Sequence, residues 1–280
     1  MKSTLYLIAT PIGNLQDISL RAIDILKNVD LIACEDTRHT GQLLSHFSIK
    51  KRLTSLHQHN EKEKTHSILE IIKAGGSVAY VSDAGTPAIS DPGAFLVNQA
   101  HLNQLHIVPI PGASALTTIF SAAGISSSHF QFVGFLPSSH GKSKKALQDI
   151  FSQNMTTIFY ESPHRVIKTL TAIVEVFGSD QELVIGRELT KLFETIYKGK
   201  AISLLEKINQ NPNDQKGEFV IIISATEKKV LSQPSLSDEQ TLKVLLSELP
   251  LNQAVKLTAI IFKKNKKDVY NQALELKNDK

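Results

Sequence analysis

The feature that most constrains this chain is a regular alternation of short apolar runs with stretches of helical periodicity. The runs are rich in β-branched residues and bounded by turn formers, as in buried strands. They are Leu5–Ile8, Leu31–Cys34, Arg52–Leu56, Val78–Ser82, His106–Ile110, Phe130–Gly134, Thr157–Tyr160, Leu183–Arg187, Glu194–Lys198 and Phe219–Ser224. Helical spacing occurs between them over Ser19–Lys27, Glu61–Ala74, Ser114–Ala123 and His164–Phe177. The alternation predicts an α/β fold with largely parallel sheets.

Turn formers divide the chain. Pro111-Gly112 and the stretch 124–128 precede a second series of strands, so we expect one α/β domain over 1–115 and another over 116–225. Gln233-Pro234-Ser235 has the composition of a linker. Beyond it, Asp238–Leu249, Asn252–Phe262 and Lys267–Lys277 have helical patterns, which predicts a small helical appendage over 226–280.

Composition limits the function classes. The 280 residues include one cysteine and no apolar run near the roughly 20 residues that cross a membrane, so we expect a cytoplasmic protein without disulfides. Residues 226–280 hold 10 Lys against 7 Asp and Glu, which is +3 of the chain's net +4. This basic excess points to a nucleic-acid partner or, alternatively, to a solvated tail.

The loop Ser82–Gly93 is the strongest candidate for a ligand site. It follows an apolar strand, and ligands of open α/β sheets bind at the carboxyl ends of the strands. The loop contains Asp83 but no Lys or Arg, so it suits a cationic or zwitterionic ligand better than a phosphate. Asp91-Pro92 resembles a helix N-cap followed by its first residue, so we expect a helix to start there.

Other strand ends exclude some cofactors and offer candidate residues. Ala9–Leu15 lacks the G-x-G-x-x-G of dinucleotide sites, which argues against NAD, FAD and Walker-type nucleotides. His57 and His59 lack a third ligand at standard spacing, so no metal is expected. Ser162-Pro163 predicts a second helix start, with Tyr160 and Glu161 at the strand tip and Arg165 in the first turn.

These motifs, taken in order, resemble the tetrapyrrole methylase family of S-adenosylmethionine-dependent enzymes, and most closely its branch that acts on ribosomal RNA. The resemblance covers residues 2–225 and is carried by Ala9–Leu15, Cys34–Arg38, His57–Glu61, Ser82–Gly93, Pro111–Ala115, Tyr160–Arg165, Arg187–Glu194 and Gly217–Val220. Tetrapyrrole-modifying members generally have Gly-Asp-Pro where this chain has Ser82-Asp83-Ala84-Gly85, which favours the RNA branch.

The resemblance implies two α/β domains with the cofactor in the cleft between them, in a homodimer. It implies methyl transfer from S-adenosylmethionine to the ribose 2′-hydroxyl of a cytidine in 16S ribosomal RNA, free or within the 30S subunit. The residues that it assigns to the cofactor are Pro11, Val81, Ser82, Asp83, Ala84, Gly85, Ser114, Ala115, Tyr160, Leu189, Gly217 and Glu218.

Methyl transfer to a hydroxyl needs a base and gains from a nearby cation. The candidate bases are Glu161, Glu188 and Glu35, and the candidate cations are Arg165, Arg187 and Lys191. Arg38, His59, Lys263 and Lys264 are the expected RNA contacts.

Two alternatives for the activity stay open: the chain methylates a tetrapyrrole or a protein, or it is a non-catalytic RNA-binding module. A further alternative concerns the C-terminal helices, which could be a structural cap or a dimer contact.

Overall fold

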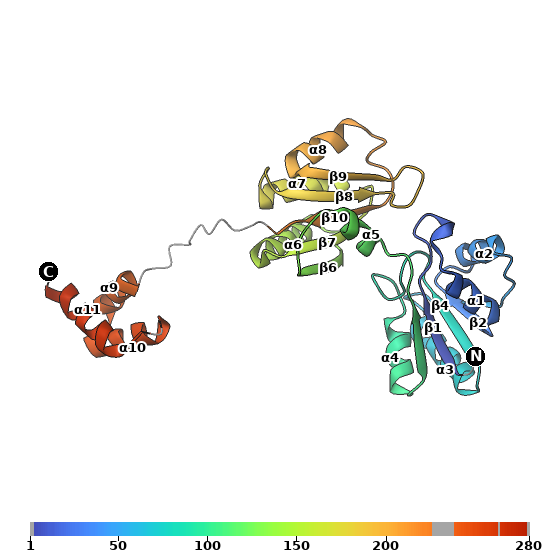
Figure 1. The fold of residues 1–280 in the computed structure, drawn as a ribbon, viewed down its shortest axis with the longest axis horizontal. Helices are drawn as coiled ribbons and strands as arrows, with labels where there is room; N and C mark the ends of the chain where they lie inside the picture. Colours follow the sequence, from blue (N-terminus) through green and yellow to red (C-terminus); the bar gives the residue numbers. More distant parts are fainter. Residues whose placement is uncertain (1–2, 226–237, 263, 279–280) are drawn as a thin grey trace. The chain divides into compact units, whose positions relative to one another are not determined.

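The computed structural model describes residues 3–225, 238–262 and 264–278 (Figure 1). The chain forms two compact units, Met1–Thr226 and Glu227–Lys280. The first unit contains two five-stranded sheets, and the second consists of helices.

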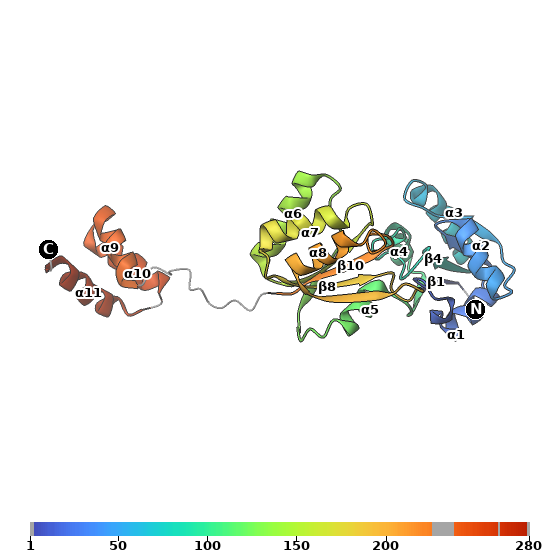
Figure 2. The ribbon, with the colours of Figure 1, turned by 90° about the horizontal axis from the view of Figure 1, so that it is seen from above.

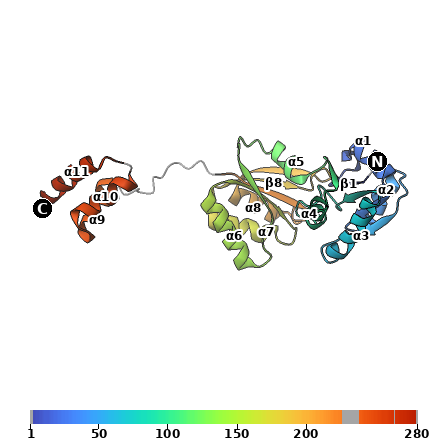
Figure 3. The same ribbon diagram turned by 90° about the horizontal axis from the view of Figure 1, so that it is seen from below.

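The first sheet is entirely parallel, with the strand order β3-β2-β4-β1-β5. Helices α1 and α2 pack on one face, where Ala22, Ile25, Leu26 and Leu44 are buried, and α3 and α4 cover the other (Figure 3). The central strands β2 and β4 are buried along their whole length, as expected for parallel strands covered on both faces. The elements are β1 (Thr4–Ile8), the 3₁₀ helix η1 (Leu15–Asp17), α1 (Leu20–Asn28), β2 (Leu31–Cys34), α2 (Thr37–His46), β3 (Leu53–Ser55), α3 (Glu61–Lys73), β4 (Ser77–Val81), α4 (Ala94–Leu102) and β5 (His106–Ile110).

The second sheet has the order β6-β7-β10-β8-β9 and is mostly antiparallel, so the expectation of largely parallel sheets was wrong for this half. Only β6 and β7 run parallel, and α6 makes their crossover. Helices α6, α7 and α8 cover one face and α5 the other (Figure 2). The elements are α5 (Ala115–Ala122), β6 (Phe130–Phe135), α6 (His140–Gln153), β7 (Thr156–Glu161), α7 (Val166–Phe177), β8 (Glu182–Arg187), β9 (Thr195–Lys200), α8 (Ala201–Gln210) and β10 (Phe219–Ile223).

The second unit is a set of three helices with a core of its own. They are α9 (Asp238–Glu248), α10 (Leu251–Ile261) and α11 (Lys266–Asn278), close to the ranges expected from the sequence. Leu242, Val255 and Val269 contribute one fully buried side chain from each helix. The expected linker Gln233–Ser235 lies outside the described residues.

The start of α4 differs from the sequence expectation. Asp91 is not the N-cap: the cap residue is Gly93, with φ of +119°, and the helix begins at Ala94. Glu61, at the start of α3, caps the helix from a distance, because its Oε1 accepts hydrogen bonds from the N–H groups of Gly93 (2.9 Å), Phe95 (3.2 Å) and Leu96 (3.3 Å). The start predicted at Ser162-Pro163 was also too early, since α7 begins at Val166.

The cap by Glu61 generates a stability prediction. Replacing Glu61 by Ala leaves these N–H groups without their acceptor, and we expect it to lower the free energy of unfolding by about 1–2 kcal/mol. Urea denaturation of the full chain measures the change. Glu63→Ala is the matched control, because it removes an exposed carboxylate from the same first turn of α3. Equal losses in the two variants would contradict the capping role.

Candidate active site

The candidate site forms where the strands of the first sheet end. Because parallel strands end at the same edge of a sheet, the loops after β1, β2, β4 and β5 come together there. Two reciprocal backbone hydrogen bonds join the loops after β1 and β4: Thr10 N–H donates to the Gly85 carbonyl (2.9 Å) and Gly85 N–H to that of Thr10 (3.0 Å). The sequence motifs around Pro11 and Asp83 are therefore physically connected.

The second half of the unit contacts this edge at two places. The N–H of Asn14 donates to Thr190 Oγ1 (3.1 Å), and a side chain at Gly13 would collide with Lys191. A side chain at Gly134, at the end of β6, would lie 2.9 Å from Ser90 Oγ. Close packing at both places holds the two halves in a defined geometry.

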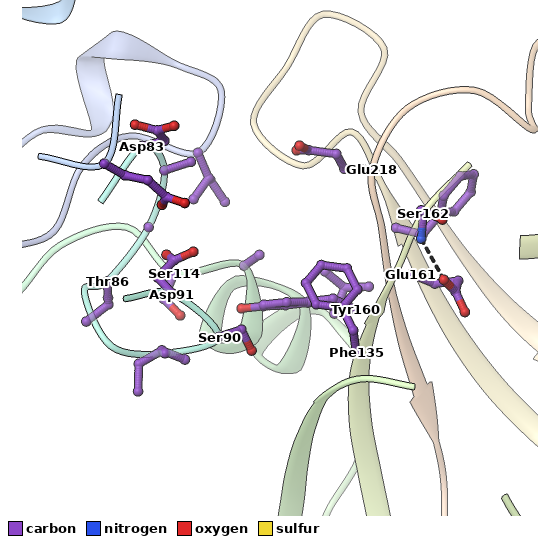
Figure 4. A pocket seen from close by; sticks show the side chains of 18 of the residues that line it. Asp83, Thr86, Ser90, Asp91, Ser114, Phe135, Tyr160, Glu161, Ser162 and Glu218 are labelled. Atoms are coloured by element: carbon purple, nitrogen blue, oxygen red, sulfur yellow. Dashed lines mark hydrogen bonds between the residues drawn. The ribbon is translucent and has the colours of Figure 1, made fainter. Parts of the chain in front are cut away.

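Between these contacts lies a pocket of about 500 Å³, which we call the cofactor pocket because the resemblance predicts a cofactor there (Figure 4). Asp83, Thr86, Ser90, Asp91 and Ser114 face it from the first half, and Tyr160 and Phe135 from the second. Among the described residues that line it, five are acidic and none is Lys, Arg or His. The lining residues are Ile12, Glu35, Asp83, Ala84, Gly85, Thr86, Ile89, Ser90, Asp91, Ser114, Ala115, Phe135, Tyr160, Glu161, Ser162, Pro163, Glu218, Phe219 and Val220.

Two carboxyls on the first half of the pocket, those of Asp91 and Glu35, have raised pKa values. Burial and the neighbouring charges of Glu35 and Asp83 raise the pKa of Asp91 to about 6, against an opposing hydrogen bond with Ser82. Burial and Asp83 also raise the pKa of Glu35. Asp83 accepts a hydrogen bond from the N–H of Asp36 (3.1 Å). The pocket therefore has a negative wall that favours a cation.

The opposite wall is aromatic. Tyr160 packs edge-on against Phe132 and Phe135, with ring centroids 4.9 and 5.5 Å apart. Burial raises the pKa of Tyr160, although its hydroxyl is hydrogen-bonded to the backbone of Leu116 and the side chain of Ser114. This contact links the tip of β7 to the start of α5.

The residues that the resemblance assigns to the cofactor fall into two groups. Asp83, Ala84, Gly85, Ser114, Ala115, Tyr160 and Glu218 line the cofactor pocket. The others do not. Pro11 and Ser82 line a smaller cavity with Asp83 and His39, Val81 is buried at the end of β4, and Leu189 belongs to the core beneath α5. Gly217, with φ of +93°, leaves room for the side chain of Glu188.

Of the five residues expected to be catalytic, only Glu161 lines the pocket, and both of its carboxylate oxygens are engaged. Oε1 accepts from the N–H of Ser162 (2.8 Å) and Oε2 from Thr169 Oγ1 (2.7 Å). Arg165 forms an ion pair with the same carboxylate: its Nε lies 3.1 Å from Oε1, and its Nη2 donates to Oε2 (3.2 Å). Figure 4 shows the Glu161 carboxylate on the side of β7 away from Tyr160, as the alternation of a strand requires.

Glu188, Lys191 and Glu218 form a charged bridge between the loop after β8 and the residues before β10. Lys191 Nζ donates to Glu188 Oε1 and Glu218 Oε2, both at 2.9 Å. Burial opposes ionisation of Glu188, but hydrogen bonds from the backbone of Glu218 and from Lys191 lower its pKa. Glu218 is the member of this bridge that also lines the pocket.

Arg187 points away from the pocket into the protein. Its Nε donates to the carbonyl of Lys216 (2.7 Å) and its Nη2 to that of Asn213 (2.6 Å), and only 8% of the residue is exposed. Its guanidinium therefore fixes the loop before β10.

The expected RNA contacts are spread over both units. Arg38 is exposed at the start of α2 and paired with Asp36 (2.7 Å), and His59 is exposed just before α3. In the second unit, Lys264 is paired with Asp238, and Lys263 lies outside the described residues.

Sequence reasoning missed Asp91 as a site residue, because the pair Asp91-Pro92 was interpreted as a helix start. Its position in the same strand-end loop as Asp83 was the available signal. Within the described ranges, His, Cys, Asp and Glu side chains form no group of three able to hold a metal ion. No helix in that part of the chain is long and apolar enough to cross a membrane.

Two family models match the chain. Residues 4–204 match "Tetrapyrrole (Corrin/Porphyrin) Methylases", and residues 233–277 match "RsmI C-terminal HTH domain". Relatives named ribosomal RNA small subunit methyltransferase I are 44% identical over 97% of this chain. Those of Pasteurella multocida and Escherichia coli O157:H7 are covered over 96% and 94% of their own length.

Solved structures share the fold at low identity. Diphthine synthase superposes with a TM-score of 0.61 at 16% identity, over 79% of this chain and 90% of its own. A cobalt precorrin-4 methyltransferase of cobalamin biosynthesis gives 0.57 at 15% identity, over 79% and 94%. The expected two-sheet α/β fold with helical C-terminal segments is confirmed, and the chain belongs to the tetrapyrrole (corrin/porphyrin) methylase family.

Proposed function

We propose that this chain transfers the methyl group of S-adenosylmethionine to the ribose 2′-hydroxyl of a cytidine in 16S ribosomal RNA, free or within the 30S subunit. The observation that carries the proposal is the near full-length similarity to the ribosomal RNA small subunit methyltransferases I. Action on this RNA implies a cytoplasmic location.

The lining of the cofactor pocket fits S-adenosylmethionine. This molecule carries a sulfonium and an ammonium group and no phosphate, so it gains from carboxylates and needs no basic cradle. Asp83 and Glu35 supply negative charge, and the aromatic wall of Tyr160 and Phe135 suits its apolar and ring portions. The site residues assigned from the resemblance that line this pocket are therefore the proposed cofactor contacts.

When bound, the cofactor supplies a methyl group on a positively charged sulfur leaving group. The protein must hold the ribose oxygen in line with that bond, and such positioning is worth about 7–11 kcal/mol. We assign the proton acceptor to Asp91, because it lines the pocket and its carboxylate has no cationic partner among the described residues. Glu35, on the same wall, is the competing base.

The remaining charged residues support the site in this proposal. The Glu161–Arg165 pair holds the tip of β7, and Arg165 also donates to the Leu136 carbonyl (2.8 Å). The bridge of Lys191 with Glu188 and Glu218 holds the rim next to Val220. Arg38, His59 and the C-terminal lysines contact RNA.

A homodimer is also part of the proposal. Leu192 and Phe193, in the loop between β8 and β9, are 90% and 66% exposed, and large apolar side chains at this exposure favour a protein contact. We expect a second copy to cover them.

Tritiated S-adenosylmethionine, incubated with the protein and 30S subunits or 16S RNA, tests the activity. Label in a cytidine 2′-O-methyl group supports the proposal. Label in a tetrapyrrole or protein, or none in any acceptor, overturns it in favour of a different substrate or a non-catalytic RNA-binding module.

Asp83 generates a prediction on cofactor affinity. Asp83→Asn removes a negative charge from the pocket while its side-chain oxygen still accepts from the Asp36 N–H. We expect S-adenosylmethionine to bind about 10- to 150-fold more weakly, the cost of one hydrogen bond to a charged group. Calorimetry measures the affinity. Asp24→Asn, at an exposed position of α1, makes the same charge change outside the pocket, and this variant should bind the cofactor normally.

Asp91 generates a prediction on pH dependence. A base with a raised pKa is protonated and inactive below that value, so kcat/KM should rise tenfold per pH unit up to about pH 6 and then level off. Asp91→Asn should lower kcat about 10²- to 10⁴-fold and abolish this inflection. If Glu35→Gln abolishes the inflection and Asp91→Asn retains it, Glu35 is the base instead.

The C-terminal unit generates a prediction on substrate binding. Because its helices have their own core, a chain that ends at residue 231 should stay folded and bind S-adenosylmethionine normally. We expect it to bind 16S RNA more weakly and with a shallower salt dependence, as lost phosphate contacts require. Filter binding at several salt concentrations measures this. Loss of cofactor binding would instead identify the segment as a structural cap.

A further inference from the structure

A second groove, of about 510 Å³, lies beside the cofactor pocket and has the opposite charge. Its walls are the start of α7 and the loop between α8 and β10. We call it the basic groove, and its polar lining includes His164, Lys168, Asn209 and Lys216. None of the described residues that line it is acidic.

The lysines of the basic groove are available to a ligand. Lys168 and Lys216 are exposed, and within the described ranges neither forms an ion pair. Among the described residues, Lys216 Nζ donates only to the neutral Asn213 Oδ1, at 3.1 Å. Two unneutralised ammonium groups and an imidazole thus border one concave surface, which favours an anion.

The groove and the cofactor pocket adjoin each other. Pro163 lines both, and Gly217, in the groove, is followed directly by Glu218 in the pocket. A polymeric substrate with its reacting group in the pocket would therefore have a nearby part of its backbone at the groove.

One wall of the groove is fixed in advance by Arg187. Its bonds to the carbonyls of Asn213 and Lys216 hold the loop that carries the Lys216 side chain. A wall that is already ordered loses less entropy when a ligand binds. Arg187, expected from sequence to be catalytic, therefore has the geometry of a positioning residue.

We propose that the basic groove binds a phosphodiester of the RNA substrate next to the target ribose, with Lys168 and Lys216 as the phosphate contacts. The inference rests on the proposed function, because it requires an RNA substrate in the adjoining pocket. It assigns to Arg187 the role of holding Lys216 in place.

The test is the double variant Lys168→Ala/Lys216→Ala in the full chain. Its matched control is Lys27→Ala/Lys50→Ala, which also removes two exposed lysines. Lys27 lies near the end of α1 and Lys50 shortly before β3, so both are on the side of the first sheet where β2 and β3 begin, opposite the strand ends that form the site. The measurements are KM for 16S RNA at several salt concentrations, S-adenosylmethionine affinity and melting temperature.

We expect the groove variant to raise KM about tenfold or more near 0.1 M salt and to reduce the salt slope by about 0.7–0.9, the value for one phosphate that loses its contacts. Cofactor affinity should stay at the wild-type value. If the groove variant has the same KM and the same salt slope as the control, the groove assignment is overturned. The proposed function still stands in that case, provided that the wild-type protein methylates RNA. If the wild-type protein labels no RNA, the proposed function itself fails.

Arg187→Lys separates positioning from direct contact. The variant keeps the positive charge but cannot reach both carbonyls with one planar group. We expect KM for RNA to rise with the salt slope unchanged and kcat at saturating RNA retained. A salt slope reduced by the amount expected for one phosphate contact would show that Arg187 itself binds phosphate. An unchanged KM would show that the groove does not need Arg187 to hold the loop of Lys216.

Discussion

The pair of backbone hydrogen bonds between Thr10 and Gly85 is the interaction on which the site depends. It joins the loops after two adjacent parallel strands, and Thr10 Oγ1 adds a bond to the Ser82 carbonyl (3.0 Å). Gly85 has φ of +80°, which a side chain would strain. These bonds fix Ser82 and Gly85, on the two sides of Asp83, which lines the pocket. In the loop after β1, the N–H of Asn14 donates to Thr190 Oγ1 of the second half.

The sequence predicted the features that depend on residues near one another in the chain, such as the strand bounds. The bounds of β2 and β5 match the apolar runs residue for residue, and the convergence of the strand-end loops follows from parallel pairing. The direction of the second sheet was missed, because a short apolar run has the same composition in either orientation. The contacts of Glu61 and Arg187 were not predicted for a related reason. Glu61 bonds the Gly93 N–H, 32 residues away, and Arg187 bonds the carbonyls of Asn213 and Lys216, 26 and 29 residues away, and every residue has such backbone groups.

The electrostatics of the cofactor pocket favour a charged ligand over an empty site. Burial and the charges of Glu35 and Asp83 raise the pKa of Asp91, and burial and Asp83 raise that of Glu35, so these two carboxyls of the free pocket hold their protons at higher pH than isolated carboxyls do. A cation in the pocket favours their ionised forms. The acidic wall therefore favours a positively charged ligand. This property distinguishes the pocket from the phosphate sites of nucleotide-binding α/β folds, which favour an anion.

The two concave surfaces of the first unit have linings of opposite charge. A lysine inside the cofactor pocket would repel a sulfonium, and a carboxylate inside the basic groove would repel a phosphate. The chain separates them at the turn Gly217-Glu218, where Lys191 neutralises Glu218 on the pocket side and Arg187 holds the carbonyl of Lys216 on the groove side. Gly217, with φ of +93°, lies between Lys216 and Glu218, and the chain bends there, so that Lys216 lines the groove and Glu218 the pocket.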